Sequence, residues 1–230
     1  LQSVGAFKRE VNLPVFHAAR ITDIATARHS IQEGLLDMVA MTRAHIADPH
    51  LVKKLADGRE DEIRPCIGAT HCMSPQRPVC LHNPATGREI KMPQTVQPSD
   101  GPQRKAVIVG GGPAGLEAAR VLGERGHEVV LFEAAPKLGG QILMGVQASW
   151  RADLAGIVDW RSNEAQRLGV DVRTSQYAEL EDVLAEDPDI VIIATGGVPD
   201  LDWLEGVEHC TSAWDFLTGN AAVGEEVVVY

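Results

Sequence analysis

The stretch from Lys105 to Glu133 reads KAVIVGGGPAGLEAARVLGERGHEVVLFE and sets the architecture of this chain. It opens with an apolar run, 106–109, that has the length and β-branched content of a buried parallel strand. A helical pattern then runs to Gly126, and a second apolar run, 129–132, leads directly to an acid. The stretch therefore predicts a strand, a helix and a second strand parallel to the first, which is the repeating unit of an α/β sheet.

The glycines after the first strand follow the G-x-G-x-x-G spacing of dinucleotide-binding turns. Gly110 would make the tight turn, Gly112 would let the backbone approach a pyrophosphate, and Gly115 would let the helix pack closely on the strand. The helix N-terminus would then face the phosphate charge. Glu133 lies about 20 residues further on, where an acid accepts hydrogen bonds from the adenine ribose. A glycine-rich turn that binds no nucleotide is the alternative, but the complete set of elements favours dinucleotide binding.

The chain has 230 residues, of which 44% are hydrophobic, and a formal net charge of -11. No apolar run approaches the about 18 residues of a membrane helix, and no signal-peptide pattern opens the sequence. The negative charge argues against nucleic acid and anionic membranes as partners. Four cysteines, three of them between 66 and 80, do not resemble a secreted disulfide framework, so we expect a cytoplasmic protein.

Residues 1–63 alternate between strand and helix patterns, which predicts parallel strands over 15–18 and 37–41. Arg20 and Arg43 each follow one of these strands, at the edge where parallel sheets bind their ligands. Two arginines at neighbouring strand ends suit a phosphate. The equal alternative is that both are surface charges of loops.

The segment 66–104 holds three cysteines, two histidines and six prolines, and it shows little periodicity. Such a segment usually needs a metal or a covering domain to order it. The cysteines could hold a three-iron cluster, or a four-iron cluster completed by a histidine or an external ligand. Zinc bound by the cysteines and one histidine is an alternative, as are three free thiols. The candidate ligands are Cys66, Cys72, Cys80, His71 and His82.

The rest of the chain continues the α/β alternation. The loop 136–141 contains two glycines that permit close backbone approach to a ligand. An amphipathic helix is predicted over 151–168, with Trp160 in the core. A short strand, a short helix and an apolar strand follow over 170–173, 180–184 and 189–194, and the last strand leads into Thr195-Gly196-Gly197. Cys210 is expected to be a small buried residue.

Five motifs, in this order, resemble the multidomain NADH:flavin oxidoreductase family over essentially the whole chain. They are Arg64-Pro65-Cys66-Ile67-Gly68, the stretch from Cys80 through Asn83-Pro84 to Glu89, the VGGGPAG turn, Leu138-Gly139-Gly140-Gln141 and Ala194-Thr195-Gly196-Gly197. This family includes trimethylamine dehydrogenase and 2,4-dienoyl-CoA reductase. Three further stretches resemble its bacterial demethylases, of the N-methylproline or dimethylglycine type: His17 to Ile21, Met41 to Ile46 and Ala148 to Arg151.

The resemblance implies an α/β fold in three parts. Residues 1–63 would be the last two β/α units of an FMN-binding TIM (β/α)8 barrel, and 64–104 would be an iron–sulfur-type cysteine segment with a linker. Residues 105–230 would form a Rossmann-like FAD/NAD(P)-binding domain, incomplete at its C-terminus. A complete barrel takes about 250 residues, and Val227–Tyr230 reads as a strand cut short. We therefore expect a fragment of a longer protein.

The resemblance also implies the cofactors FMN, an iron–sulfur cluster (4Fe-4S or 3Fe-4S) and FAD or ADP, with NAD(P)H used by the reductases of the family. Ala69 stands where the family has its second cluster cysteine, and the Cys72–Cys80 interval is shorter than usual. The FMN phosphate would be bound by Ala19, Arg20, Thr42 and Arg43, and the cluster by Cys66, Cys72 and Cys80. The adenine nucleotide would be bound by Gly110, Gly112, Pro113, Ala114, Gly115, Glu133, Gly140, Gln141, Thr195, Gly196 and Gly197.

The function that the resemblance implies is that of a flavin-dependent oxidoreductase. It would pass electrons between a small organic substrate at FMN, the iron–sulfur centre and the FAD/ADP domain, and we expect oxidative demethylation of an N-methyl amine. One alternative is NAD(P)H-dependent reduction of an enoate or a 2,4-dienoyl-CoA; another is a nucleotide-binding electron-transfer module without turnover. The catalytic acids would lie in the absent part of the barrel, so no catalytic residue is named. Whether the partner is a second copy or an electron-transfer protein is left open.

Overall fold

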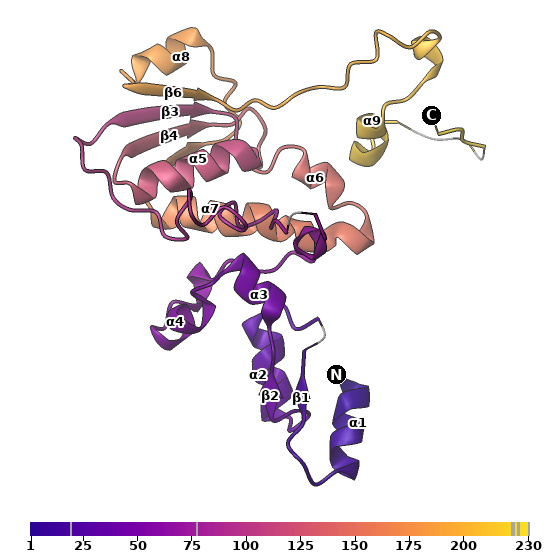
Figure 1. Cartoon of the computed structure of the whole chain (residues 1–230). Helices are drawn as coiled ribbons and strands as arrows, with labels where there is room; N and C mark the ends of the chain where they lie inside the picture. Colours follow the sequence, from indigo (N-terminus) through magenta and orange to yellow (C-terminus); the bar gives the residue numbers. More distant parts are fainter. Residues whose placement is uncertain (19, 77, 222–223, 225, 230) are drawn as a thin grey trace. The chain divides into compact units, whose positions relative to one another are not determined.

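The computed structural model describes residues 1–18, 20–76, 78–221, 224 and 226–229. It divides the chain into two compact units, Leu1–Val96 and Gln97–Tyr230 (Figure 1). Two sequence expectations, the phosphate-binding residue Ala19 and the strand residue Tyr230, lie outside the described residues. None of the described helices is both long and apolar enough to cross a bilayer.

The second unit is built on a parallel sheet of four strands in the order β5-β4-β3-β6 (Figure 1). At its centre Val107 pairs with Val130 on one side and with Val191 on the other. Numbered along the chain from β3, this is the 3-2-1-4 order of a Rossmann half. The Rossmann-like α/β expectation is therefore confirmed. The strands are β3 (Lys105–Val109), β4 (Glu128–Phe132), β5 (Asp171–Arg173) and β6 (Ile190–Ile193).

Helices pack on both faces of this sheet. On one face α5 (Pro113–Glu124) and α7 (Gly156–Arg167) bury a core formed by Ile108, Leu116, Ala119, Val129, Leu131 and Val158. On the other face α8 (Leu180–Ala185) packs through Val183 against Val107, Val130 and Phe132. Because both faces are covered, β3 and β4 are apolar along their length instead of alternating with polar residues.

A buried ionic cluster joins α5 to α7, and the apolar patterns do not predict it. Glu117 accepts hydrogen bonds from Arg161 Nε at 2.8 Å and from Arg120 Nη2 at 2.7 Å. Both guanidinium groups lie over Trp160, at 5.6 and 5.8 Å from its ring centroid, a cation–π distance. Trp160 itself is buried, as expected. The cluster fixes α7 against the helix that follows the glycine turn.

Three local expectations for the second unit are corrected. The helix expected over 151–168 begins as a 3-10 helix, η3 (Ser149–Ala155), before α7 continues it. Cys210 is exposed, because it follows the short surface turn η4 (Val207–His209) and packs in no core. Residues 227–229 form no strand, since no described strand pairs with them. The remaining helices of this unit are α6 (Ile142–Gly145) and α9 (Ala213–Thr218).

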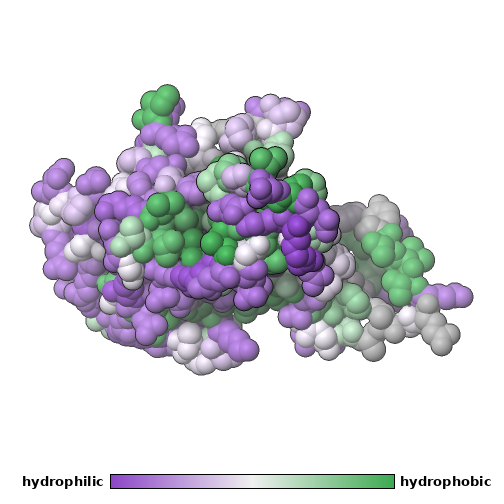
Figure 2. Space-filling model, turned by 90° about the horizontal axis from the view of Figure 1, so that it is seen from below, coloured by the Kyte–Doolittle hydropathy of each residue, from purple (hydrophilic) through white to green (hydrophobic). Residues whose placement is uncertain are grey.

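Apolar side chains also reach the surface. On the face seen in Figure 2, hydrophilic residues predominate and hydrophobic residues emerge in separate patches. In the second unit the exposed apolar residues include Val191 and Ile193 on β6, which is an edge strand of the described sheet. Unpaired strand edges of this kind are potential pairing sites for other chains or segments.

The first unit contains a two-stranded parallel sheet, β1 (Phe16–His17) and β2 (Met38–Val39), connected by α2 (Ile24–Gln32). Asp23 caps α2, because its carboxylate accepts a hydrogen bond from the Thr26 N–H at 2.7 Å. The strands are shorter than expected but parallel, as predicted. The core consists of Val15, Ile21, Ile24, Ala27, Leu36, Met41, Ala44 and Leu51. The other helices are α1 (Gln2–Glu10), α3 (Thr42–Ala47), α4 (Leu51–Ala56), η1 (Glu60–Glu62) and η2 (His71–Met73).

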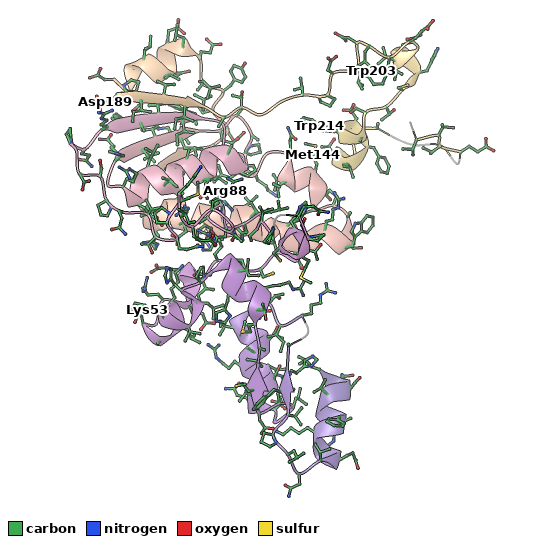
Figure 3. All side chains as sticks on the ribbon, viewed as in Figure 1. Lys53, Arg88, Met144, Asp189, Trp203 and Trp214 are labelled. Carbon is green, nitrogen blue, oxygen red and sulfur yellow. The ribbon has the colours of Figure 1, made fainter. Side chains whose placement is uncertain are left out.

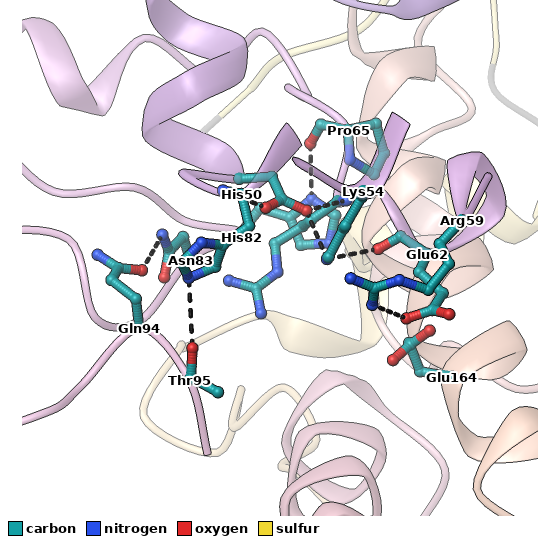
Figure 4. A network of polar contacts seen from close by, with 12 residues as sticks. His50, Lys54, Arg59, Glu62, Pro65, His82, Asn83, Gln94, Thr95 and Glu164 are labelled. Carbon is teal, nitrogen blue, oxygen red and sulfur yellow. Dashed lines mark hydrogen bonds and ion pairs between the residues drawn. The ribbon is translucent and has the colours of Figure 1, made fainter. Parts of the chain in front are cut away.

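The cysteine segment, which lies within the first unit up to residue 96, is held in place by buried polar side chains (Figure 4). Asn83, almost fully buried, donates from Nδ2 to the Ile46 carbonyl at 3.0 Å and to Gln94 Oε1 at 2.9 Å. His82, fully buried, is hydrogen-bonded through Nδ1 to the Pro65 carbonyl at 2.9 Å. These bonds hold a segment that has little regular secondary structure, because they replace the backbone ladders that it lacks.

Asp48 is the buried carboxylate that joins α3, α4 and the start of the cysteine segment. It accepts hydrogen bonds from Lys54 Nζ at 2.7 Å and from the N–H groups of His50 and Arg64, each at 2.9 Å (Lys54 and His50 in Figure 4). Burial by itself would raise the pKa of Asp48, but Lys54 and the backbone donors outweigh it, so that the pKa lies below its usual value.

We predict that Asp48→Asn lowers the free energy of unfolding of the first unit by about 3 kcal/mol, because Lys54 loses its buried partner. Asp57→Asn, which removes an exposed partner of Lys53 and Arg59, is the matched control and should cost less than about 1 kcal/mol. Since the folded pKa of Asp48 is lowered, its contribution is present above the unfolded value of about 3.9 and lost as pH falls below it. Urea unfolding followed by circular dichroism at pH 7 and pH 3 measures both effects; equal losses in the two variants would contradict the role of Asp48.

Candidate functional site

The residues expected to bind an adenine nucleotide gather at one edge of the large sheet. Gly110 directly follows β3, Glu133 directly follows β4, and Thr195 lies two residues beyond β6. These strands are parallel and adjacent, so their carboxyl ends share one edge. Ligands of open α/β sheets bind at this edge, outside the carboxyl ends of the strands.

Two glycines of the turn are required by the fold itself. Gly110 has φ +109°, and a Cβ atom there would overlap the carbonyl group of Ala194. A Cβ atom on Gly115 would overlap the carbonyl oxygen of Gly110. The first turn of α5 therefore lies directly against the turn after β3, which brings the helix N-terminus to the edge of the sheet.

The third glycine leaves open space. A Cβ atom on Gly112 would find Gly140 Cα as its nearest neighbour, at 4.0 Å. Gly112 is the N-cap of α5, and Pro113 and Ala114 form the first turn of the helix; no side chain among the described residues caps it. Uncapped N–H groups at a helix N-terminus carry a partial positive charge and bind phosphate oxygens. The turn thus offers donors and room where a diphosphate would lie.

Glu133 is already engaged with the backbone of the turn. Its carboxylate accepts one hydrogen bond from the Gly111 N–H and one from the Ala135 N–H, both at 2.7 Å. An ionised carboxylate offers about four lone-pair positions, so about two remain for other donors. Glu133 can therefore fix the glycine turn and still accept hydrogen bonds from ribose hydroxyls. The sequence pattern predicts only the second of these roles.

Two loops close around the glycine turn. The Gly139 N–H donates to the Gly111 carbonyl at 2.9 Å, and a Cβ atom on Gly140, which has φ +50°, would lie 3.2 Å from Gly112 Cα. Gln141 Nε2 donates to the Gly197 carbonyl at 3.0 Å and so links the loop after β4 to the loop after β6. A Cβ atom on Gly196 would lie 3.5 Å from Gln141 Nε2, and one on Gly110 would lie 3.0 Å from the Thr195 nitrogen. The residues expected from three separate motifs are thus brought together.

The residues expected at the FMN phosphate lie past the ends of the short strands of the first unit. Arg20 is exposed and has the left-handed φ of +55°, uncommon for a residue with a side chain. Thr42 opens α3, so Arg43 lies in the first turn of a helix, and the alternative of a loop charge does not hold for it. Arg43 is half-buried and lines a hollow beside the cysteines.

That hollow brings the three expected cluster cysteines together. Cys66, Cys72 and Cys80 line it together with His71 and Arg43, and all three thiols are free and partly buried. Burial raises the pKa of the Cys72 thiol, and the neighbouring Cys80 and Cys66 raise it further. Within the described residues no three His, Cys, Asp or Glu side chains are grouped for a single metal ion, which a zinc site would require. A four-iron cluster takes one thiolate per iron, so its ligands stand further apart.

A second hollow, which the sequence does not predict, lies between α6 and α9. Its volume is about 420 Å³, within the range of small-molecule pockets. Leu143 and Met144 contribute from α6, and Phe216 and Leu217 from α9. Met144 and Trp214 mark the two helices in Figure 3. None of the expected site residues lines this hollow.

The sheet order, the glycine turn and the loops closing on it define a nucleotide-binding domain of the Rossmann class. A family model described as an NAD(P)-binding Rossmann-like domain matches residues 108–177. This agreement confirms the class of the second unit. The match includes the turn, α5, β4 and α7.

Longer similarities extend over the whole chain. It is 56% identical over 230 residues to a multifunctional alkene reductase/demethylase of Caballeronia cordobensis, and 48% identical over 235 residues to a probable N-methylproline demethylase of Rhizobium meliloti. Both matches cover 100% of this chain and 34% of the relative. The solved structure of a 2-naphthoyl-CoA reductase complex matches 97% of this chain and 35% of its own with a TM-score of 0.88 at 29% identity. Over its whole length the chain is thus homologous to enzymes of the NADH:flavin oxidoreductase family, and it spans about a third of the length of these relatives.

We predict that Gly115→Ala destabilises the second unit by about 1–3 kcal/mol, because the new methyl group overlaps the Gly110 carbonyl oxygen. In an ordinary helix the same change would stabilise by up to about 1 kcal/mol. The control is Gly145→Ala in α6, where no atom lies within 4 Å of the added Cβ. Urea unfolding followed by tryptophan fluorescence measures both, since all four tryptophans belong to the second unit. A Gly115→Ala chain as stable as the control would show that the close approach is not required.

Proposed function

We propose that residues 105–230 bind the ADP part of FAD, or ADP itself, at the glycine turn. The observation that carries this proposal is the combination of an open space at Gly112 with an uncapped α5 N-terminus. The diphosphate would accept hydrogen bonds from the backbone N–H groups of this turn. Glu133 would accept hydrogen bonds from the ribose, and Gly140, Gln141, Thr195, Gly196 and Gly197 would border the nucleotide.

We propose that the first unit supplies one side of a second cofactor site. Residues 1–63 would be the last two β/α units of an FMN-binding TIM barrel, and the parallel β1–β2 pair with the following Arg20, Thr42 and Arg43 supports this. Residues 64–104 would be the iron–sulfur segment that holds a cluster through Cys66, Cys72 and Cys80. The shared hollow of these cysteines supports that assignment.

For the complete protein we propose flavin-dependent oxidative demethylation of an N-methyl amine. The support is the 56% and 48% identity, over this whole chain, to relatives whose names include demethylase activity. A bound flavin would supply the two-electron redox chemistry, and the protein would supply binding, orientation and electrostatics. In this chain the glycine turn would anchor a nucleotide and the arginines a phosphate. None of its residues is assigned to proton transfer.

Two observations keep reductive chemistry as a second candidate. One relative is named both an alkene reductase and a demethylase, and the structural neighbour is a 2-naphthoyl-CoA reductase. Reduction of a conjugated double bond with NAD(P)H would use the same cofactors with the opposite direction of electron flow. A nucleotide-binding electron-transfer module without turnover is the third candidate.

Gly112→Val should lower the affinity for ADP and FAD at least tenfold, which corresponds to about 1.4 kcal/mol, because the branched side chain fills the space proposed for the diphosphate. Gly101→Ala, in the linker before β3, is the matched control and should bind both nucleotides like the unchanged chain. Titration calorimetry measures the affinities, and circular dichroism verifies the fold. Equal ADP affinities in the two variants would refute the proposed diphosphate position.

Glu133→Gln separates the two roles of this residue. The unchanged chain should prefer ADP to 2′-deoxy-ADP, because the ribose 2′-hydroxyl would donate a hydrogen bond to the ionised carboxylate. A hydrogen bond to a charged group contributes about 1.5–3 kcal/mol. The variant should lose most of that preference. If Glu133 only fixes the turn through the Gly111 N–H, both nucleotides will weaken equally and the preference will persist, which would contradict the ribose contact.

Turnover separates the candidate functions. A complete protein carrying this sequence, reconstituted with FMN and FAD, is assayed with N-methylproline, with dimethylglycine, and with NADH plus a conjugated enoyl-CoA. The full-length relative from Caballeronia cordobensis is the positive control. Formaldehyde release by a complete protein carrying this sequence supports demethylation. NADH oxidation that depends on the enoyl-CoA alone supports the reductase, and tight FAD binding without any turnover supports the electron-transfer module.

A further inference from the structure

The hollow of the cysteine segment has a methyl group where a cluster ligand is expected. Ala69 stands at the second position of the Cys66-x-x-Ala69-x-x-Cys72 spacing and lines the same hollow as the three thiols. A methyl group cannot bind iron. Three thiolates leave one iron of a four-iron cluster without a protein ligand. The fourth ligand must therefore come from another side chain at the hollow or from outside the protein.

Two histidines of the segment differ sharply in where they lie. His82 is fully buried, its Nδ1 is hydrogen-bonded to the Pro65 carbonyl at 2.9 Å, and it is not among the residues that line the hollow (Figure 4). This hydrogen bond holds the residue before Cys66 against the segment that carries Cys80. His82 is thus a structural residue that positions the cysteines.

His71 lies at the hollow itself. Thr70 adopts the left-handed conformation, with φ +60°, and η2 begins immediately afterwards with His71 and Cys72. Both of these residues line the hollow. His71 is exposed, so its imidazole can adjust without displacing core residues. Imidazole nitrogen is an established alternative to thiolate on an iron of an iron–sulfur cluster.

The charge around the hollow favours an anionic cluster. Its described lining contains no Asp or Glu, and Arg43 contributes a positive charge. Thiolate ligands carry negative charge, and a neutral imidazole in place of the fourth thiolate leaves the cluster less negative. Replacement of thiolates by histidines raises the reduction potential of iron–sulfur centres.

We infer that His71 is the fourth protein ligand of a four-iron cluster whose other ligands are Cys66, Cys72 and Cys80. This inference rests on the iron–sulfur segment proposed above. The cluster would be held by one nitrogen and three sulfur atoms. It would have a higher potential than a cluster with four cysteines in the same fold.

The test is anaerobic reconstitution of the chain with ferrous iron and sulfide, followed by iron and sulfide analysis and EPR. The unchanged chain should bind four irons, and pulsed EPR of the reduced cluster should show coupling to a nitrogen nucleus. His71→Ala should lose that coupling and bind three irons, with the EPR signal of an oxidised three-iron cluster. His71→Cys should keep four irons, lose the nitrogen coupling and have a lower reduction potential.

His29→Ala, on the exposed face of α2, is the matched control and should behave like the unchanged chain in all of these measurements. A four-iron cluster with nitrogen coupling that persists in His71→Ala would overturn the assignment of His71 and leave the cluster proposal intact. A chain that binds zinc, or that takes up no iron and sulfide, would overturn both. The three results are therefore distinguishable.

Discussion

The close approach of α5 to β3 is the constraint on which the second unit depends. It is possible only because Gly115 places no side chain against the carbonyl oxygen of Gly110. With the helix so close, its N-terminus and the Gly111 N–H lie at the edge of the sheet, within reach of the carboxylate of Glu133. The loops after β4 and β6 can then close on the turn through Gln141. The proposed nucleotide site would follow from a packing requirement, since the same glycines would serve the fold and the ligand.

In the first unit, the cysteine segment has little secondary structure and must be ordered by other contacts. Buried polar side chains supply these contacts. Asp48 accepts hydrogen bonds from Lys54 and from backbone N–H groups, and Asn83 and His82 are hydrogen-bonded to backbone carbonyl groups. Buried polar groups must be hydrogen-bonded, and a satisfied network of them specifies one arrangement. The thiols are thereby placed around one hollow.

Sequence patterns predicted the second unit well because each signal was strong and local. The Gly110–Gly115 spacing, the apolar strands and Glu133 all lie within one β-α-β unit, and the structure brings them together. Patterns failed where long-range contacts decide the outcome. The hydrogen bond from Gln141 to Gly197 and the Glu117 cluster between α5 and α7 join residues 56 and 44 positions apart. Apolar periodicity carries no information about such pairs. Arg43, which the sequence places just past a strand, lies in the first turn of α3.

The most direct test of the nucleotide site is a crystal structure of this chain with ADP. The diphosphate should lie against the Gly111–Gly112 backbone at the N-terminus of α5, and the ribose hydroxyls within hydrogen-bonding distance of the Glu133 carboxylate. ADP bound elsewhere on the second unit, or no ADP bound at the glycine turn at millimolar concentration, would contradict this prediction. Either result would leave a Rossmann-class domain whose glycines serve packing alone.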